Sequence, residues 1–200
     1  MNPGATPVAA ILAGGASRRM GFDKASIRMP KGTLLEHSAS CAAACGLRVL
    51  VVGRTEPPGW KGPHATFVAD VTPGLGPLGG LITALSVSGA SILALACDMP
   101  LLSPECVNWL LRAHADPAAP LDGLATLNGS RIEPLFSVYE QSVTSLATDQ
   151  VARGDHSLRG LVAAGSFRYA QVPPALQPAL RNINTLQDLE SLGSAVTPPR

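Results

Sequence analysis

The chain has 200 residues, of which 46% are hydrophobic and 14% are charged, and its formal net charge is +1. This composition is too apolar for intrinsic disorder, and no apolar run is long enough to span a bilayer. The nearly balanced charge provides no basic field for nucleic acid or an anionic membrane, and the first residues do not follow the pattern of a secretory signal. We expect one cytoplasmic domain over residues 1–200, with flexible ends at 1–6 and 194–200.

The N-terminal half alternates apolar runs with helical patterns. Residues 8–12 are a short apolar run that stops at two glycines, which predicts a buried strand ending in a functional loop. Thr33 and Glu36 have capping-box spacing, so a helix is predicted over residues 34–45, closed by Gly46. Residues 49–52 and 91–96 predict two further buried strands, and a helix between them is expected to end near Gly89.

The C-terminal half continues the alternation. Ser103, Pro104 and Glu105 supply the cap, the first-turn proline and the early acidic residue of a helix that runs towards His114. Residues 124–127 and 132–138 flank Asn128-Gly129, which predicts a hairpin with a type I′ turn. Helices are expected at 143–153, 158–164 and 186–192, and an extended segment at 168–172. The whole pattern predicts an α/β fold, with a doubly wound, mostly parallel but mixed sheet flanked by helices in a Rossmann-like arrangement.

A glycine-rich loop follows the first predicted strand and carries the clearest functional signal. The sequence LAGGASRRMGFDKA combines glycines, which let backbone N–H groups approach oxyanions, with the cations Arg18, Arg19 and Lys24. It fits neither the Walker pattern nor the dinucleotide fingerprint, so kinases, ATPases and Rossmann dehydrogenases lose support. Taken alone, such a loop is equally compatible with a tight turn. The loop therefore suggests a phosphate cradle of another kind.

Two later segments have the composition of ligand-binding loops. Residues 70–80, DVTPGLGPLGG, place glycines and prolines before a helix, which by itself indicates no more than a loop. Asp98 follows the apolar strand at 91–96, at the sheet edge where open parallel sheets bind ligands. A hard Mg²⁺ ion prefers carboxylate and phosphate oxygens, so Asp98 is the metal candidate, although a turn or cap role is the usual one for Asp-x-Pro. The histidines and cysteines lack the spacing of zinc ligands.

These segments together resemble the molybdenum cofactor guanylyltransferase (MobA) family. Residues 12–24 follow its LAGGxSxRMGxDK signature, and residues 70–80 and 97–102 follow its D-x(n)-GPLxG and CDxPxL elements. Residues 131–135 follow RxxPL, and residues 182–189 follow NxNTPxDL, except that Leu186 replaces the proline. Thr185 remains able to cap a helix there. The family often has an asparagine after its second strand, where this chain has Val52-Gly53-Arg54, so that contact is in question.

The resemblance implies a nucleotidyltransferase fold and a role for each matched residue. It implies nucleotide binding by Leu12, Ala13, Gly14, Gly15, Lys24, Asp70, Gly76, Gly80 and Asp98, and catalysis by Lys24, Arg18, Arg19 and Asp98, with Asp98 holding Mg²⁺. Arg131 is expected to face the pterin phosphate. Asn182 or Asn184 is expected on the metal or pterin side, although polar loop residues more often only cap helices.

The implied reaction is transfer of GMP from GTP to the terminal phosphate of molybdopterin, or Mo-molybdopterin, with release of pyrophosphate. The Gly14-Gly15 pair and the GPLGG segment favour guanine over the cytidylyltransferase that serves the same pterin. The motifs also leave open a sugar-phosphate nucleotidyltransferase and a non-enzymatic GTP-binding accessory protein. A molybdenum insertion protein and molybdoenzyme chaperones are expected as further partners.

Overall fold

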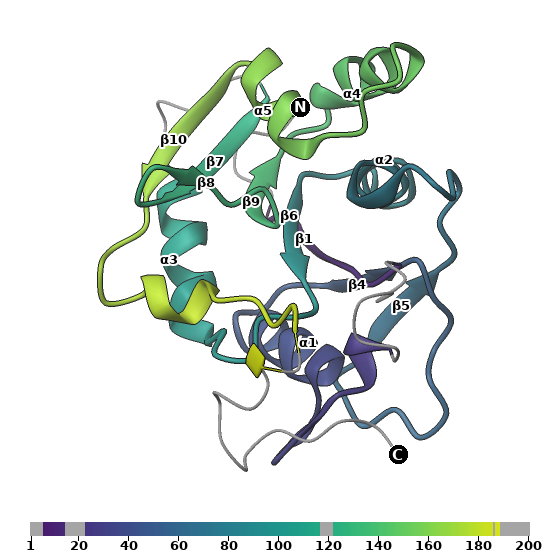
Figure 1. Cartoon of the computed structure of the whole chain (residues 1–200), viewed down its shortest axis with the longest axis vertical. Helices are drawn as coiled ribbons and strands as arrows, with labels where there is room; N and C mark the ends of the chain where they lie inside the picture. The colour runs from purple at the N-terminus through teal and green to yellow at the C-terminus, as the bar shows by residue number, and fades with distance from the viewer. Residues whose placement is uncertain (1–5, 15–22, 117–121, 186, 189–200) are drawn as a thin grey trace.

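A mixed eight-stranded sheet forms the centre of the molecule (Figure 1). This computed structural model describes residues 6–14, 23–116, 122–185 and 187–188. The strands follow the order β10-β7-β9-β6-β1-β4-β5, and β8 pairs with β7. Their bounds are β1 Val8–Leu12, β4 Val49–Val52, β5 Ala65–Val68, β6 Ile92–Ala96, β7 Gly123–Asn128, β8 Arg131–Ile132, β9 Phe136–Tyr139 and β10 Phe167–Gln171; β2 Arg28–Met29 and β3 Gly32–Thr33 form a separate antiparallel pair.

Most strand pairs in the main sheet are parallel, and the exceptions involve β8 and β9. β1 is parallel to β4 on one side and to β6 on the other, and β10 is parallel to β7. β9 lies antiparallel between β6 and β7. The predicted mostly parallel, mixed sheet is therefore confirmed.

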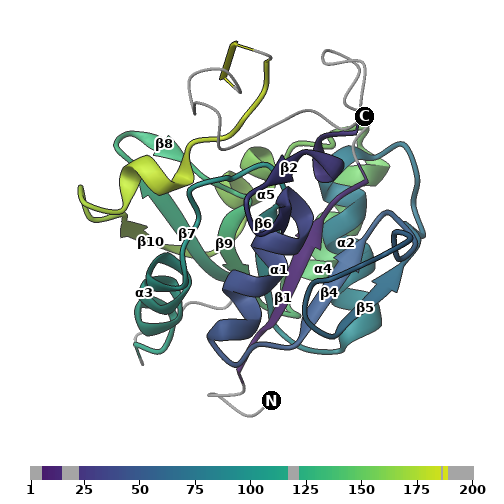
Figure 2. The ribbon, with the colours of Figure 1, turned by 90° about the horizontal axis from the view of Figure 1, so that it is seen from below.

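Helices cover both faces of the sheet (Figures 1 and 2). The helices are α1 Leu34–Ala44, α2 Gly76–Ser88, α3 Pro104–His114, α4 Val143–Ala152 and α5 Leu158–Ala164, with 3₁₀ turns η1 Lys24–Ser26 and η2 Gln177–Leu180. Along β1, Ala9 and Ile11 join the core beneath α1 and α3, whereas Val8 and Ala10 join the core beneath α2, α4 and α5. This alternation follows from the two-residue period of a strand, and it makes the fold doubly wound as predicted. Within the described part of the chain, no helix combines the length and apolarity that crossing a membrane requires.

Local capping signals place several helix ends where the sequence predicts them. Thr33 and Glu36 form the reciprocal capping box that begins α1, and Ser103 accepts a hydrogen bond from the Cys106 backbone at the start of α3. Gly89 ends α2 in the left-handed conformation, with φ of +60°. These predictions are confirmed because each depends on residues only three or four positions apart.

The predicted hairpin is partly wrong. Asn128 pairs with Arg131, so the turn residues are Gly129 and Ser130 rather than Asn128-Gly129. Only Gly129 has a positive φ, +64°, whereas a type I′ turn requires positive φ at both positions. The expected second strand at 132–138 is divided between β8 and β9 by a turn at Pro134. Of the helix predicted at 186–192, residues 187 and 188 are helical and the others lie outside the described residues.

The sheet topology brings three loops to one edge. β1, β4 and β6 are adjacent and parallel, so their carboxyl ends at Leu12, Val52 and Ala96 lie side by side. The residues that follow, including Gly14, Gly53 and Asp98, therefore begin at the same edge. Open α/β sheets bind their ligands at this edge.

Candidate active site

Lys24 connects three segments that are distant in the sequence. Its Nζ donates to Asp98 Oδ2 at 3.2 Å and to Asn184 Oδ1 at 2.9 Å. Lys24 begins η1, Asp98 follows β6, and Asn184 belongs to the stretch after η2. The side chains of Lys24 and Asp98 are only 17% and 16% exposed, so this ion pair is partly shielded from water. The structure therefore brings together three of the residues that the sequence singles out.

The Asp98 carboxylate lies in an environment that disfavours its negative charge. Burial raises its pKa, and the neighbouring Lys24 ammonium only partly opposes that rise. One carboxylate oxygen, Oδ1, is buried and accepts no hydrogen bond from the described residues, which is costly for a charged group. The Asp98 backbone carbonyl accepts a hydrogen bond from Ile183 N at 2.9 Å, which fixes the C-terminal stretch beside this loop. Asp98 therefore has an oxygen that an additional cation would satisfy.

A second capping box holds Asn184 in place. Asp188 Oδ2 accepts from the backbone N of Thr185 at 2.9 Å and of Asn184 at 3.0 Å, and Asp188 N donates to Thr185 Oγ1 at 3.0 Å. Thr185 therefore caps the following helical residues as predicted, without the proline that Leu186 replaces. Asp188 also pairs with Arg181 at 3.5 Å.

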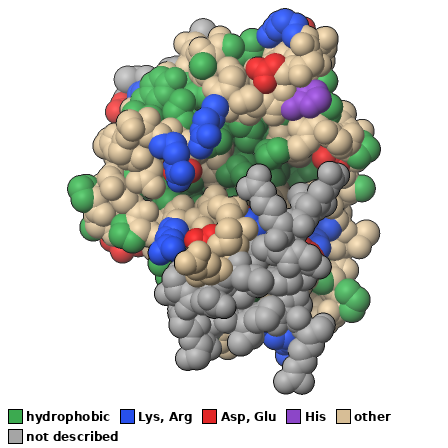
Figure 3. Space-filling model, viewed as in Figure 1, with side chains coloured by type: hydrophobic (Ala, Val, Ile, Leu, Met, Phe, Trp, Pro, Cys, Tyr) green, Lys and Arg blue, Asp and Glu red, His purple; other side chains and the backbone are tan. Residues whose placement is uncertain are grey.

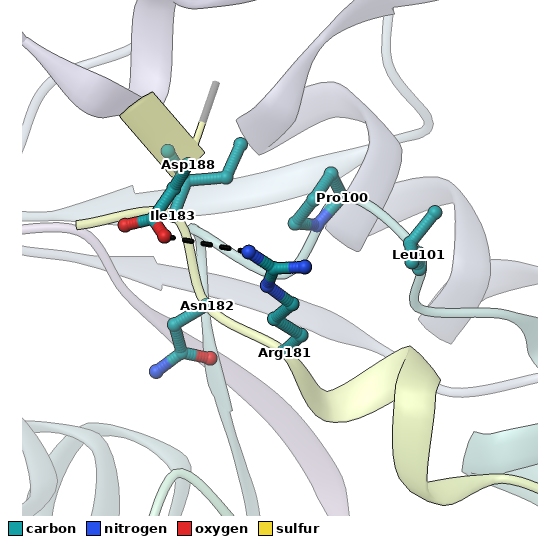
Figure 4. A pocket seen from close by; sticks show the side chains of 6 residues that line it. All are labelled: Pro100, Leu101, Arg181, Asn182, Ile183 and Asp188. Atoms are coloured by element: carbon teal, nitrogen blue, oxygen red, sulfur yellow. Dashed lines mark ion pairs between the residues drawn. The ribbon is translucent and has the colours of Figure 1, made fainter. Parts of the chain in front are cut away.

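A small pocket adjoins this capping box (Figure 4). It is lined by Pro100, Leu101, Arg181, Asn182, Ile183 and Asp188. Arg181 and Asp188 face one another across it, and the Asn182 side chain is turned away from that ion pair. The pocket thus lies between the Asp98 loop and the C-terminal stretch, next to Lys24's partner Asn184.

The described start of the glycine loop packs directly on the loop after β4. Ala13 N donates to Val52 O at 2.9 Å, and a Cβ on Gly53 would collide with Gly14 Cα and lie 2.7 Å from Gly14 N. Gly53 also has a φ of +92°, which strains any residue with a side chain. A side chain on Gly53 would thus collide with Gly14 in this structure. Gly15, Arg18 and Arg19 lie outside the described residues.

We expect Gly53→Ala to destabilise the protein by about 1–3 kcal/mol, because it adds left-handed strain and a backbone collision. It is also expected to weaken nucleotide binding, since relief of the collision displaces Gly14. Gly59→Ala is the matched control: Gly59 has a φ of +73° but nothing within 4 Å of its added Cβ. Denaturant unfolding and nucleotide titration measure both effects. Equal losses of unfolding free energy in Gly53→Ala and Gly59→Ala would show that the collision with Gly14 adds nothing to the destabilisation.

Asp23 and Arg54 form a further ion pair, and neither residue is among the functional residues predicted from the sequence. Arg54 Nη2 pairs with Asp23 Oδ2, and Asp23 also caps η1 by accepting from Ala25 N at 3.0 Å and Ser26 Oγ at 2.8 Å. Burial raises the pKa of Asp23, but these hydrogen bonds and the Arg54 charge lower it more, so the net shift is downward. Its position in the sequence could have indicated Arg54, because it lies two residues beyond the end of β4, just as Gly14 lies two residues beyond the end of β1.

The two ion pairs, Lys24–Asp98 and Asp23–Arg54, are neighbours because Asp23 and Lys24 are consecutive residues. Cys97 precedes Asp98 in the chain, and burial is the main reason that the pKa of its thiol rises to about 12. The charges of Asp98 and Asp23 raise it further, while those of Arg54 and Lys24 lower it. All four charged groups therefore act on one thiol, and this thiol is held protonated and unreactive near neutral pH.

Asp70, Gly76 and Gly80 belong to the loop after β5 and to α2. Asp70 Oδ1 accepts from Thr72 N at 3.0 Å and from the buried Thr83 hydroxyl at 2.9 Å, so it ties the loop to α2. Gly76 is exposed with a φ of +60° and has open space around it. Gly80 is buried, and a Cβ there would lie 3.3 Å from Leu12 Cδ2. Gly80 thus allows α2 to pack on Leu12, and the predicted nucleotide contacts of these residues remain predictions.

Arg131 lies apart from the Lys24 cluster, on β8. Its side chain is 61% exposed, and its Nε and Nη2 donate to Glu133 Oε1 at 2.9 and 2.6 Å. Figure 3 shows basic side chains on the face that carries β8, beside an apolar area. Arg131 is therefore accessible to an anionic ligand, although no hydrogen bond between described residues links it to Lys24 or Asp98.

The Asp98 carboxylate offers one oxygen of the kind that a hard divalent cation prefers. Among the described residues, no group of three or more His, Cys, Asp or Glu side chains could hold a metal ion. A complete protein cage is therefore not present there. Mg²⁺ does not need one, because one or two carboxylates, waters and substrate phosphates commonly complete its shell. The Asp98 Oδ1 atom, which has no donor within the described part of the chain, suits that role.

Comparison with known proteins identifies the family. The model described as "MobA-like NTP transferase domain" matches residues 9–172. A molybdenum cofactor guanylyltransferase of Syntrophotalea carbinolica is 31% identical over 188 residues, which are 91% of this chain and 88% of that protein. The solved structure of molybdopterin-guanine dinucleotide biosynthesis protein A from Archaeoglobus fulgidus has a TM-score of 0.75 at 24% identity and covers 92% of this chain and 95% of that one. The fold of 2-C-methyl-D-erythritol 4-phosphate cytidylyltransferase from Thermus thermophilus is also similar, with a TM-score of 0.60 at 17% identity and coverage of 92% and 95%. The chain belongs to the MobA-like NTP transferase family.

Proposed function

We propose that this protein transfers GMP from GTP to the terminal phosphate of molybdopterin. The observation that carries the proposal is the convergence of Lys24, Asp98 and Asn184 at the ligand-binding edge of the sheet, next to the glycine loop. The similarity to molybdenum cofactor guanylyltransferases along most of the chain supports the choice of substrates.

The reaction places its main demand on charge neutralisation. An oxygen of the molybdopterin phosphate forms a bond to the α-phosphorus of GTP, and the bond from that phosphorus to the β-phosphate oxygen breaks as pyrophosphate leaves. The attacking group is already an anion, so no strong general base is needed. Catalysis then consists of in-line positioning and of offsetting the repulsion between two phosphate groups. Lys24 supplies a cation at the sheet edge where the phosphates are expected to bind.

Asp98 is the residue that would hold Mg²⁺, through the oxygen that has no donor among the described residues. When bound, the ion supplies positive charge to the phosphate oxygens of the reacting groups. The other carboxylate oxygen, Asp98 Oδ2, accepts a hydrogen bond from Lys24 Nζ. Lys24 Nζ also donates to Asn184 Oδ1, and the two hydrogen bonds together orient this side of the carboxylate. The predicted cations Arg18 and Arg19 would add to the neutralisation from the glycine loop.

The acceptor is expected beside the C-terminal stretch. Asn182 lines the pocket next to Asn184, and Arg131 presents an exposed guanidinium for the acceptor phosphate. Ile183 anchors this stretch to Asp98, so a ligand bound there lies next to the proposed reaction centre.

A panel of nucleotides and acceptors tests the proposal. The purified protein is incubated with Mg²⁺, each of the four nucleoside triphosphates, and either molybdopterin or a sugar phosphate, and pyrophosphate release is followed. Release only with GTP and molybdopterin is expected. Preference for CTP would replace the proposal with a cytidylyltransferase, and turnover with sugar phosphates would replace it with a sugar-phosphate enzyme. Tight GTP binding without pyrophosphate release would indicate an accessory protein.

A further inference from the structure

The segment that carries Lys24 is short and needs external support. η1 contains only three residues, Lys24–Ser26, and a 3₁₀ turn of this length has few internal hydrogen bonds. Ala25 and Ile27 are buried and fix its inner side. On its outer side, the turn is held by the Asp23 carboxylate, which accepts from Ala25 N and Ser26 Oγ. The orientation of Lys24 therefore depends on where Asp23 is held.

Arg54 connects Asp23 to the central sheet. It follows the last residue of β4 by two positions, and Gly53 N donates to Val68 O at 2.9 Å, which extends the pairing with β5. The Arg54 side chain is 22% exposed, and its guanidinium pairs with Asp23 Oδ2, the same oxygen that accepts from Ser26. A rigid strand end is thus linked through one side chain to the turn that carries Lys24.

We infer that Arg54 is a positioning residue, which acts through Asp23 to hold Lys24 where it meets Asp98 and Asn184. This inference rests on the proposed function, because Lys24 is taken as the cation that neutralises phosphate charge. An ion pair in which Asp23 is 39% exposed contributes little to stability. Its loss is therefore expected to appear in the orientation of Lys24 and in turnover rather than in the melting temperature.

A double-mutant cycle separates this role from direct substrate binding. The variants are Asp23→Asn, Arg54→Gln and the double variant. Asp23→Asn removes the negative charge but keeps a side-chain oxygen that can cap η1. If Arg54 acts through Asp23, each single change lowers kcat about tenfold with little change in the KM for GTP, and the double variant is no worse than the singles. If Arg54 contacts the triphosphate itself, its loss raises KM and the two effects multiply, which overturns the inference. Arg54→Lys is expected to recover part of kcat because it restores the charge.

Arg168→Gln is the matched control for loss of an arginine ion pair. Arg168 is 24% exposed and pairs with Asp116 at 2.7 Å. It lies near the start of β10, the outermost strand on the side of the sheet away from β4 and β5. The Arg168→Gln variant is expected to leave kcat unchanged. The melting temperature of Arg54→Gln is expected within about 2 °C of that of the unaltered protein.

A spectroscopic measurement tests the inference without turnover. The chain has three lysines, Lys24, Lys31 and Lys61, so ¹³C labelling of the lysine ε-carbons produces three signals, and Lys24→Arg assigns one of them. In Arg54→Gln we expect the Lys24 signal to move towards those of the exposed Lys31 and Lys61. An unmoved Lys24 signal overturns the inference. If the unaltered protein fails to transfer GMP, the proposed function fails, while this spectrum still decides whether Arg54 positions Lys24.

Discussion

Asp98→Asn is expected to lower guanylyl transfer by about a thousandfold and, at the same time, to leave the folded protein at least as stable. The loss of turnover follows from the loss of the anionic oxygen proposed to hold Mg²⁺, since charge stabilisation by a metal is worth several kcal/mol and each 1.4 kcal/mol is about tenfold in rate. The gain or preservation of stability follows from the state of the carboxylate, which is largely buried and has one oxygen without a donor among the described residues. The Lys24 ammonium loses its counter-ion in this variant, but it keeps Asn184 Oδ1 as an acceptor and gains the asparagine amide oxygen as another.

The direction of the pKa shift sets the pH range of this effect. Burial raises the pKa of Asp98 in the folded protein above the ordinary value of 3.8, despite the opposing charge of Lys24. At pH values between the unfolded-state pKa of Asp98 and its raised folded-state pKa, the folded state binds more protons than the unfolded state. Stability therefore falls as pH rises from the first pKa to the second. Above the folded-state pKa the full penalty is present, and asparagine avoids it. The stability advantage of Asp98→Asn should therefore be present at neutral pH and disappear below the unfolded-state pKa.

Denaturant unfolding at several pH values, together with pyrophosphate release at saturating GTP, measures both parts. Asp98→Glu serves as a control, because it keeps the charge while moving the oxygens by one methylene. Guanylyl transfer by Asp98→Asn at a rate near that of the unaltered protein would exclude Asp98 as the metal-holding residue.

Lys24→Met is expected to reduce turnover by about 10²–10³-fold, a size typical of removing one preorganised charge-stabilising group. Its effect on stability should have the opposite sign to that of Asp98→Asn. Methionine fills similar space but leaves Asp98 without its cation, and breaking one half of a shielded ion pair is costly. Because both side chains are about one-sixth exposed, we expect a loss of about 1–3 kcal/mol rather than the larger cost of a fully buried pair.

The double variant Lys24→Met/Asp98→Asn distinguishes this explanation from a general packing defect. It should recover most of the stability lost in Lys24→Met, because no unpaired carboxylate remains, and it should stay inactive. Urea unfolding of the four proteins gives the coupling free energy directly. Stability losses that simply add would mean that Lys24 and Asp98 do not interact in solution.

Local sequence patterns predicted much of the fold. The capping box at Thr33, the cap at Ser103 and the left-handed glycine at Gly89 fixed helix ends because their geometry involves neighbours within a few residues. The hairpin after β7 was predicted less well. Its turn shifted by one residue and its second strand was divided, since register depends on how β9 pairs with both β6 and β7.

By itself, the sequence determined the alternation of strands and helices, the glycine loop after β1, and a carboxylate at the end of β6. These follow from hydrophobic period, glycine placement and strand direction, which are all local properties. Only the tertiary structure decided that Lys24 Nζ meets both Asp98 and Asn184, 74 and 160 residues away, and that Gly53 touches Gly14. It also revealed the Arg54–Asp23 ion pair. Such contacts depend on strand order and loop paths, which bring distant segments together within hydrogen-bonding distance and leave no pattern between neighbouring residues.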